Sequence, residues 1–462
     1  MKRLFFIAII ALSFCASASA QHNLRTGYFL DGYTYRHKLN PAFGGDRGYF
    51  AIPILGYTTL GVESNLALST LLYPTGNGNL TTFLSPMVSA DDFLSKIHDD
   101  NPLNVNADIS LFSLGFNAGK SFHTIDMSIK ADARANVPGA LFSWTKQYGN
   151  LLDMSSLGFN MDSRVEVSYG YSRPINDWIR IGAKVKLLAG AAKAEYSMEQ
   201  LTLTMQEDMW RAVAQGKGYF SVPGVDFETE GRTITGINMS DISTILDKAS
   251  QTNNYGFAVD LGITMEVIEN LIVSASVTDL GFINWQGMTL GSENASIEHI
   301  GFEGLGESAD IKDQLIGLGN DMLEIISPEV RGRNDRLNEM LSMTAHVGVE
   351  YIMPFWDRLS VGALGTYRFD GPYSWWEARG SINLALFNWF SLTGNYAHST
   401  FGGSYGAAIN FHPNGINFFV GVDSYKPALN MTKQYVPIDS FNTTLAIGLN
   451  FAFGGYHGRF DK

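Results

Sequence analysis

The chain has 462 residues, a formal charge of −13 and one cysteine, Cys15. An acidic chain argues against nucleic-acid binding, which needs a basic face, and a single cysteine near the start excludes disulfides and cysteine-ligated metal from the rest of the chain. The 48 glycines, 30 phenylalanines and 20 tyrosines occur with only 17% charged residues, which is unusual for a long soluble domain.

The first twenty residues have the pattern of a secretory leader. Lys2-Arg3 gives a positive start, and residues 4–14 form an apolar run that is too short to span a bilayer as a helix. Ala18-Ser19-Ala20 supplies the small residues that precede a cleavage site. We therefore predict a signal peptide over residues 1–20, cleaved after Ala20, and an exported mature protein.

A short basic segment follows the leader. Arg36-His37-Lys38 runs into Asn40-Pro41-Ala42, and Pro41 ends any extended pairing there because it lacks a backbone N–H. A loose periplasmic leader is one interpretation, since termini are often poorly ordered. A plug is the other, because a basic segment can offset carboxylates in a low-dielectric interior. We predict a plug over residues 21–47.

Strict alternation of apolar and polar residues recurs through the remainder of the chain. It is clearest in residues 122–135, 178–187 and 341–353. Similar runs occupy residues 163–173, 255–267, 358–369, 375–387 and 441–453. A period of two is typical of strands with one buried face, so an all-β fold is expected.

The connections between these runs are alternately short and longer, as in an up-and-down barrel whose short turns all lie at one end. Residues 48–72 are interpreted as one strand with a bend or bulge at Pro53. A hairpin there would break the even strand count of bacterial single-chain barrels. The expected fold is a transmembrane, up-and-down antiparallel β-barrel of about fourteen strands over residues 48–462.

Alternation alone does not say which face of the sheet is inside. A soluble β-sandwich would bury the apolar face, but a closed sheet of this size is too wide for apolar side chains to fill. Turned outward, the apolar face meets lipid, and closure satisfies the backbone hydrogen bonds. Tryptophans near strand ends favour the same choice because they form interfacial girdles; they are Trp178, Trp356, Trp375, Trp376 and Trp389.

The opposite face of each strand then lines a lumen. Both signs of charge occur there, which predicts a cross-linked interior and not a single-sign ion filter. The predicted lumen-lining residues are Asp126, Lys130, Asp132, Arg134, Arg180, Lys184, Asp260, Glu266, His346, Glu350, Arg368 and Arg379. These pairs either only stiffen the barrel or take part in transport, and lumen polarity fits both.

Parts of the long loops change from a period of two to a helical pattern. The predicted helical segments are 89–100, 206–216, 239–250 and 308–327. The first of them contains acidic side chains that could bind a divalent cation; this group is Asp91, Asp92, His98, Asp99 and Asp100. Because EF-hand or other ligand spacing is absent, a solvated loop helix is preferred, and we predict neither a metal nor a cofactor.

Residues 402–406, Gly-Gly-Ser-Tyr-Gly, match the G-x-S-x-G pattern of a hydrolase nucleophile. That motif needs a turn from a strand into a helix, whereas here it lies between two predicted strands, where glycines serve a hairpin. No serine and histidine are paired by spacing, so we predict no catalytic residues and no enzyme.

The segment from Tyr33 to Phe43, with Asn40-Pro41-Ala42 just before a strand, resembles the plug of FadL-like fatty-acid transporter barrels. It is also similar to the shuttle barrel of the Bacteroidota type IX secretion system. The stretches "YRHKLNPAF" and "GYFAIPILG" more closely resemble an uncharacterised outer-membrane family of Bacteroidota, over residues 28–72. The resemblance implies that Asn40, Pro41 and Ala42 lie in the lumen. Arg36, His37 and Lys38 would then face acids such as Asp126, Asp260 or Glu350.

These features predict a bacterial outer-membrane barrel in contact with lipids. The first functional hypothesis, implied by the FadL-like resemblance, is a passive channel or transporter for a small, hydrophobic or amphipathic molecule. The second is a non-transporting adaptor or shuttle that contacts surface or secreted proteins through its long loops, residues 193–254 and 282–340. An outer-membrane hydrolase is the third and least favoured.

Overall fold

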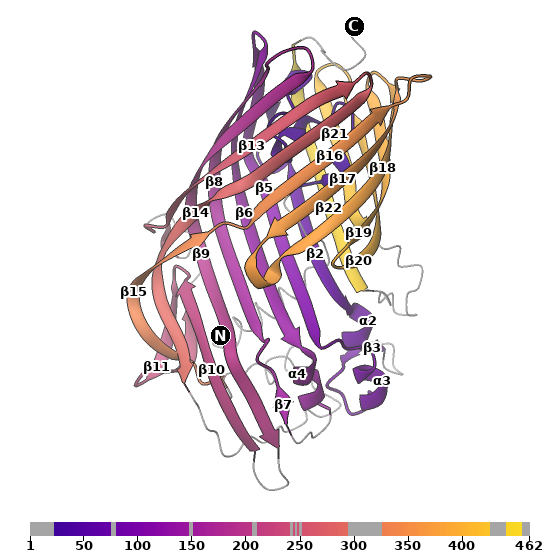
Figure 1. Ribbon diagram of the computed structural model, residues 1–462. Helices are drawn as coiled ribbons and strands as arrows, with labels where there is room; N and C mark the ends of the chain where they lie inside the picture. Colours follow the sequence, from indigo (N-terminus) through magenta and orange to yellow (C-terminus); the bar gives the residue numbers. More distant parts are fainter. Residues whose placement is uncertain are drawn as a thin grey trace.

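The computed structural model describes residues 23–74, 80–146, 151–205, 210–240, 244, 247–248, 252–293, 326–425 and 440–454. They form a closed, antiparallel β-barrel of 14 strands (Figure 1). The predicted all-β barrel is therefore confirmed. No helix in these parts of the chain is both long and apolar enough to cross a membrane.

The wall of the barrel follows the order of the sequence. Its strands are β1 (Gly48–Ala51) with β2 (Thr58–Ala67), β5 (Asp100–Ala118), β6 (Ser121–Pro138), β8 (Gly158–Pro174), β9 (Ile179–Met205), β13 (Tyr255–Ile268), β14 (Leu271–Glu293), β16 (Met343–Ile352), β17 (Leu359–Phe369), β18 (Trp375–Phe387), β19 (Phe390–Ser399), β20 (Gly402–Phe411), β21 (Ile416–Tyr425) and β22 (Ser440–Phe453). β22 pairs with both β1 and β2, which closes the sheet.

The predicted single strand over residues 48–72 occupies one place in the wall, but it is divided into β1 and β2 and ends at Ala67. β1 and β2 share the neighbours β5 and β22, and between them lie residues 52–57. We call this segment the strand break. Pro53 falls inside it, where its missing N–H disturbs no ladder. Ile54 N donates to Ser110 O and Leu449 N donates to Leu55 O, so the break is still tied to both neighbouring strands.

The two ends of the barrel differ. Short turns join β5 to β6, β8 to β9, β13 to β14, β18 to β19 and β20 to β21 at one end, which we call the short-turn end. The C-terminal end of β22 lies there as well (Figure 1). At the opposite, long-loop end, β9 and β14 continue beyond the barrel wall and are joined by β10 (Trp210–Ser221).

Further elements complete the long-loop end and the lumen. The remaining strands are β3 (Leu72–Pro74), β4 (Leu80–Thr82), β7 (Leu152–Asp153), β11 (Val225–Glu230), β12 (Thr233–Met239) and β15 (Glu329–Met340). The helices are η1 (Arg25–Gly27), η2 (Thr34–Lys38), α2 (Leu68–Leu71), α3 (Ala90–Leu94), α4 (Gly139–Trp144) and η3 (Gly371–Tyr373). We call β10, β11, β12 and β15, with the ends of β9 and β14, the outer extension.

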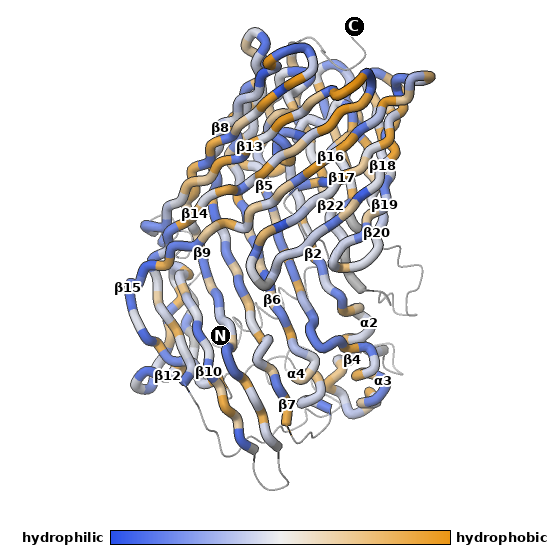
Figure 2. Tube along the Cα trace, in the orientation of Figure 1, coloured by the Kyte–Doolittle hydropathy of each residue, from blue (hydrophilic) through white to orange (hydrophobic). Residues whose placement is uncertain are grey.

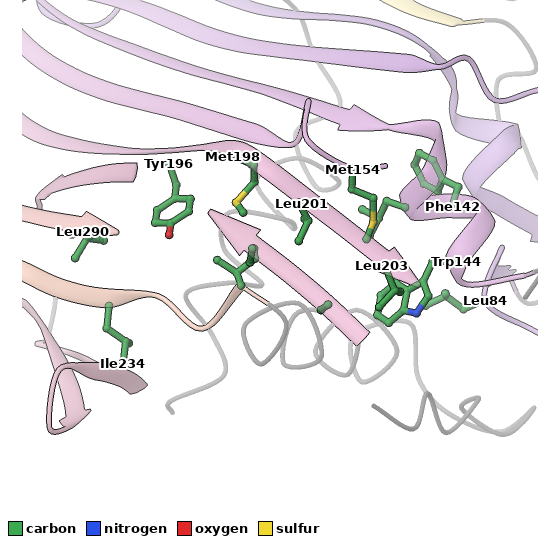
Figure 3. Close-up of a cluster of buried hydrophobic side chains, with 14 of the residues drawn as sticks. Leu84, Phe142, Trp144, Met154, Tyr196, Met198, Leu201, Leu203, Ile234 and Leu290 are labelled. Carbon is green, nitrogen blue, oxygen red and sulfur yellow. The ribbon is translucent and has the colours of Figure 1, made fainter. Parts of the chain in front are cut away.

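The largest apolar cluster lies at the long-loop end and not in the lumen. Residues of β9, β10, β14 and the α3 and α4 regions form it (Figure 3). Its labelled members in Figure 3 are Leu84, Phe142, Trp144, Met154, Tyr196, Met198, Leu201, Leu203, Ile234 and Leu290. Apolar burial therefore holds the outer extension to the loops, whereas polar contacts dominate inside the barrel.

The helical predictions for the loops had mixed outcomes. Residues 90–94 form α3, which is shorter than the predicted segment 89–100. The prediction for 206–216 was wrong from Trp210 onward, because this stretch is β10. Its pairing with the overhanging end of β9 buries Ala212 and Ala214 on one face, and such tertiary pairing overrides local propensity. Most of the segment 239–250 lies outside the described residues, although Thr244, Asp247 and Lys248 are helical. The segment 308–327 lies outside them except for its last two residues.

The apolar face of the wall is on the outside. Hydrophobic and hydrophilic residues alternate along the strands in Figure 2. Trp178, Trp356, Trp376 and Trp389 are exposed on the outer surface, as interfacial tryptophans are. Trp375 was wrongly grouped with them: it points inward, is buried, and lies 5.0 Å from the Arg25 guanidinium.

This facing predicts how a charge placed in the wall will behave. Val347 lies mid-strand in β16 and is 57% exposed on the outer face. Val347→Arg should lower the free energy of unfolding by about 2–4 kcal/mol, because it puts a guanidinium into hydrocarbon. Thr344→Glu, on the inner face opposite Arg368, should cost much less, because the new carboxylate meets a guanidinium group. Urea titration in lipid vesicles measures both, and equal losses would contradict the assigned faces.

Candidate functional site

Residues 23–47 run inside the barrel, and we call them the plug. Two short 3-10 helices, η1 and η2, give the segment its turns. Nearly every residue from Leu24 to Ala42 is buried or half-buried. Such a segment cannot be held by its own backbone bonds, so the barrel wall has to supply most of its partners.

Arg25 anchors the start of the plug, and its side chain is almost fully buried. Its guanidinium lies 3.0 Å from Glu377 and 3.5 Å from Asp423. Asp423 also accepts hydrogen bonds of 2.7 Å from the backbone N–H groups of Arg25 and Thr26. Arg379 completes the network, 3.2 Å from Asp423. This network joins the plug to β18 and β21.

The basic residues of η2 meet the opposite wall. Lys38 Nζ donates to Asp108 of β5 at 2.9 Å. Lys184 donates to Nδ1 of His37 at 3.1 Å, and Nε2 of His37 bonds the Tyr49 hydroxyl at 2.8 Å. Burial, reinforced by the Lys184 ammonium, lowers the pKa of His37 to about 3. His37 is therefore neutral and acts as a hydrogen-bonding spacer.

Asn40-Pro41-Ala42 lies directly on the inner wall. It covers Gly182 of β9 and Gly262 of β13, which are opposite one another across the two strands. A Cβ at either glycine would overlap with this tripeptide. The Asn40 amide donates to the backbone carbonyls of Ile263 and Ala275. The two glycines therefore create the flat patch that seats the plug.

This seat predicts a sharp effect from one added methyl group. Gly262→Ala should displace Asn40-Pro41-Ala42, because the new Cβ needs the space of the Asn40 amide. Overpacking of this kind costs about 1–3 kcal/mol. Hydrogen exchange of the plug amides should rise in this variant. Gly394→Ala is the matched control, since a Cβ there meets nothing within 4 Å; equal exchange in both variants would refute the seat.

The middle of the plug is held by hydrogen bonds from wall side chains near the short-turn end. Ser391 and Asn410 donate to the backbone carbonyl of Asp31, and Asn417 donates to that of Gly32. A cavity of about 30 Å³ lies beside this region, lined partly by Tyr33, Tyr49, His412, Asn417 and Asn450. A space of this size holds about one water molecule.

Aromatic residues of the plug lie directly behind the strand break. Tyr33 and Tyr35 pack with Tyr49, Tyr57 and Phe419, with ring centroids 4.8–6.3 Å apart. We call these five residues the tyrosine cluster. On the outer face of the break, Ile54 and Leu55 are about 60% exposed. The wall is therefore interrupted where both of its faces are largely apolar.

The other predicted lumen charges form ion pairs across the strands, on the side of the plug that faces the long-loop end. Lys130 lies 3.0 Å from Glu166, and Lys186 lies 2.8 Å from Asp260. A second group joins three arginines to three aspartates through the pairs Arg134–Asp162, Arg134–Asp370, Arg164–Asp132 and Arg368–Asp132. Because these charges pair with one another across strands, they cross-link the inside of the barrel. Such pairing is typical of a rigid barrel more than of an open path for ions.

The remaining predicted residues have separate positions. His346 bonds Thr366, and Glu350 accepts a hydrogen bond from Ser360. Arg180 is half-buried and contacts Ser172. Glu266 is not enclosed by the lumen as predicted. It has the same strand parity as Asp260 but lies next to the turn after β13, where it is exposed and accepts a hydrogen bond from Asn270 N.

The plug contacts differ in detail from those implied by the resemblance. Asp126 is near His37, as expected, but Lys38 pairs with Asp108. Arg36 donates to the carbonyl of Tyr28 and lies 4.2 Å from the Phe43 ring, and within the described chain it forms no ion pair. Arg25 was not among the predicted plug residues. The sequence around Arg25 did not indicate that its side chain would be buried.

The G-x-S-x-G segment and the acidic loop were the two sequence features that suggested chemistry. Ser404 lies within β20, with its side chain buried against the lumen, and not at a turn from strand to helix. In the described ranges, no group of three or more His, Cys, Asp or Glu side chains is arranged to hold a metal ion.

A closed barrel with an apolar outer face, a charged lumen and a seated plug defines this chain as a plugged transmembrane β-barrel. It belongs to a family of unknown function, DUF5723, whose model matches residues 41–423. A comparison with curated proteins finds no match.

Solved structures with similar architecture are distant. The Ralstonia pickettii toluene transporter TbuX has 10% identity and a TM-score of 0.44, with 92% of this chain and 95% of that chain covered. A Pseudomonas aeruginosa FadL homologue has 10% identity and a TM-score of 0.45, covering 94% and 99%. The Pseudomonas putida toluene transporter TodX has 9% identity and a TM-score of 0.42, covering 94% of each chain.

Proposed function

We propose that the protein is an outer-membrane transporter for a small hydrophobic or amphipathic molecule, with its short turns in the periplasm and its long loops at the cell surface. The alternation of short and long connections supports this orientation. The predicted leader over residues 1–20 supports export. The resemblance of residues 28–72 to an outer-membrane family of Bacteroidota supports the same compartment.

The observation that carries the proposal is the strand break. β17 with β18 and β19 with β20 are joined by continuous ladders, and ladders elsewhere are interrupted by single bulges. Residues 52–57 instead replace a longer piece of the ladder with isolated hydrogen bonds. Apolar side chains flank the break on the lipid side, and the tyrosine cluster flanks it on the lumen side. We infer that a hydrophobic solute passes between the lumen and the bilayer at this place.

An engineered disulfide tests this route. Leu449 N donates to Leu55 O at 2.7 Å, so the two residues are neighbours across the break. In the double variant L55C/L449C, oxidation should tie the break to β22 and abolish uptake of a hydrophobic dye into vesicles. Reduction should restore uptake, because a disulfide forms and breaks without changing the rest of the wall.

The matched control is V349C/A363C, a directly opposed pair on the outer face of β16 and β17. The only native cysteine is Cys15, in the predicted leader, so no other pairing competes. Oxidation of the control pair should leave uptake unchanged. Uptake that persists when L55C/L449C is fully oxidised would contradict passage through the break.

A second candidate function, an adaptor for surface or secreted proteins, is favoured by the outer extension. β15 is largely exposed and polar, and Arg333 and Arg336 project from it. If the extension holds a protein partner, Arg333→Glu combined with Arg336→Glu should reduce display of that partner at the cell surface and leave dye uptake intact. The opposite pattern would favour transport.

A further inference from the structure

The connection between β17 and β18, residues 370–374, reaches the opposite side of the barrel. Asp370 is its first residue, and the Asp370 carboxylate forms an ion pair with the guanidinium of Arg134 on β6. Five strands (β16, β14, β13, β9 and β8) separate β17 from β6 along the shorter path round the wall. An ion pair between two such distant strands has to cross the lumen.

A second ion pair crosses the lumen beside the first. Arg368, near the end of β17, lies 3.3 Å from Asp132 of β6. Tyr373 extends in the same direction, since its hydroxyl lies 3.4 Å from the point where a Cβ on Gly158 of β8 would stand. Three side chains from one corner of the wall therefore meet the facing strands β6 and β8.

The residues of β6 in these two pairs have further partners on β8. Arg134 lies 3.0 Å from Asp162, and Asp132 lies 3.4 Å from Arg164. Removing the partners across the lumen therefore leaves no lone charge on β6, and a lone buried charge is what makes a broken ion pair costly. The crossing pairs can open while the wall of the barrel stays intact.

The crossing pairs lie on the long-loop side of the plug. Thr366 precedes Arg368 by two residues, so the two side chains share one face of β17. The Thr366 hydroxyl bonds Nδ1 of His346 at 3.1 Å, and the His346 ring lies 6.1 Å from the ring of the plug residue Tyr28. Thr366 therefore lies between the crossing pairs and the plug.

We propose that the pairs Arg134–Asp370 and Asp132–Arg368 form a latch that closes the long-loop end of the lumen to bulky solutes. Two ion pairs do not fill the section of so wide a barrel, so the exclusion of small ions stays with the plug. The lumen then has two closures. As a gate between the cell surface and the plug, the latch rests on the proposed transport function, whereas its closure of the lumen does not.

The test measures access to a thiol beneath the latch in the full-length chain. In Thr366→Cys, fluorescein maleimide should label the new thiol slowly. Arg368→Gln with Asp370→Ala breaks both crossing pairs, and it should speed labelling about tenfold or more, which corresponds to about 1.4 kcal/mol of lost closing energy. Removing a nearby guanidinium by itself disfavours the reactive thiolate, so faster labelling reports access.

Two controls accompany this variant, and heat modifiability on gels checks that each barrel is folded. Lys217→Ala breaks an exposed ion pair of the outer extension, and it should leave labelling at residue 366 slow. A thiol placed at Ser391, which contacts the plug near the short-turn end, should react at the same rate with and without the latch.

Equally fast labelling at residue 366 with the latch intact and broken would show that the lumen is already open to this depth. Equally slow labelling in both would show that other parts of the chain close it. Either result would overturn the latch. Dye uptake into vesicles is measured in parallel. Latch-dependent labelling with unchanged dye uptake would support the latch and remove it from the transport route.

Discussion

Deletion of residues 28–47, with the leader retained, should leave a barrel that inserts into the membrane but conducts small ions far better than the intact protein. The wall closes through β1, β2, β5 and β22 without help from the plug. Removing the plug, however, empties the part of the lumen between Gly182, Gly262 and the tyrosine cluster. A barrel of about fourteen strands is too wide for its wall side chains alone to fill.

Single-channel recording in planar bilayers measures this change directly. Heat modifiability on gels checks that the deleted barrel is folded. A variant with Gly394→Ala, which contacts nothing near the plug, should conduct like the intact protein. Unchanged conductance after the deletion would show that other parts of the chain close the lumen.

The second large effect is expected from Asp423→Ala. This carboxylate accepts hydrogen bonds from the backbone of Arg25 and Thr26 and lies close to the guanidinium groups of Arg25 and Arg379. Its removal leaves two backbone N–H groups without their acceptor, and it leaves the two buried cations Arg25 and Arg379 with Glu377 as the carboxylate they share. Breaking a buried ion pair from one side costs about 3–5 kcal/mol, so the start of the plug should detach from the wall.

Limited proteolysis at Arg25 and the free energy of unfolding in lipid vesicles measure this loss. Asp423→Asn keeps one acceptor oxygen and should have an intermediate effect. The pair Lys217–Glu199 is the exposed comparison, 2.8 Å apart at the surface, and Lys217→Ala should change stability by only about 0–1 kcal/mol. If Asp423→Ala were as mild, the network would not hold the plug.

The membrane-spanning architecture could be predicted from local pattern because strand geometry is local. Side chains alternate between the two faces of a strand regardless of what the strand pairs with. Residues such as Val347 and Asp126 therefore had predictable faces. The basic sequence of the plug likewise agrees with its position beside the carboxylate of Asp126. Glu266 and Trp375 show what was misjudged. Glu266 lies at the rim of the barrel, where it is exposed. Trp375 shares the inward face of Glu377 and Arg379, so strand alternation excluded it from an outer tryptophan girdle.

Partnerships between distant residues could not be predicted in the same way. Arg25 and Asp423 are separated by almost the whole chain, and only closure and register of the barrel bring them together. The same holds for the pair Lys38 and Asp108. It holds also for β10, whose sequence has a helical pattern but which forms a strand because it pairs with the end of β9. The period of two in the sequence by itself determined which side chains face lipid and which face the lumen. Only the tertiary structure decided which lumen residues meet and where the wall is broken. Both depend on strand register and on the path of the plug, which local pattern does not encode.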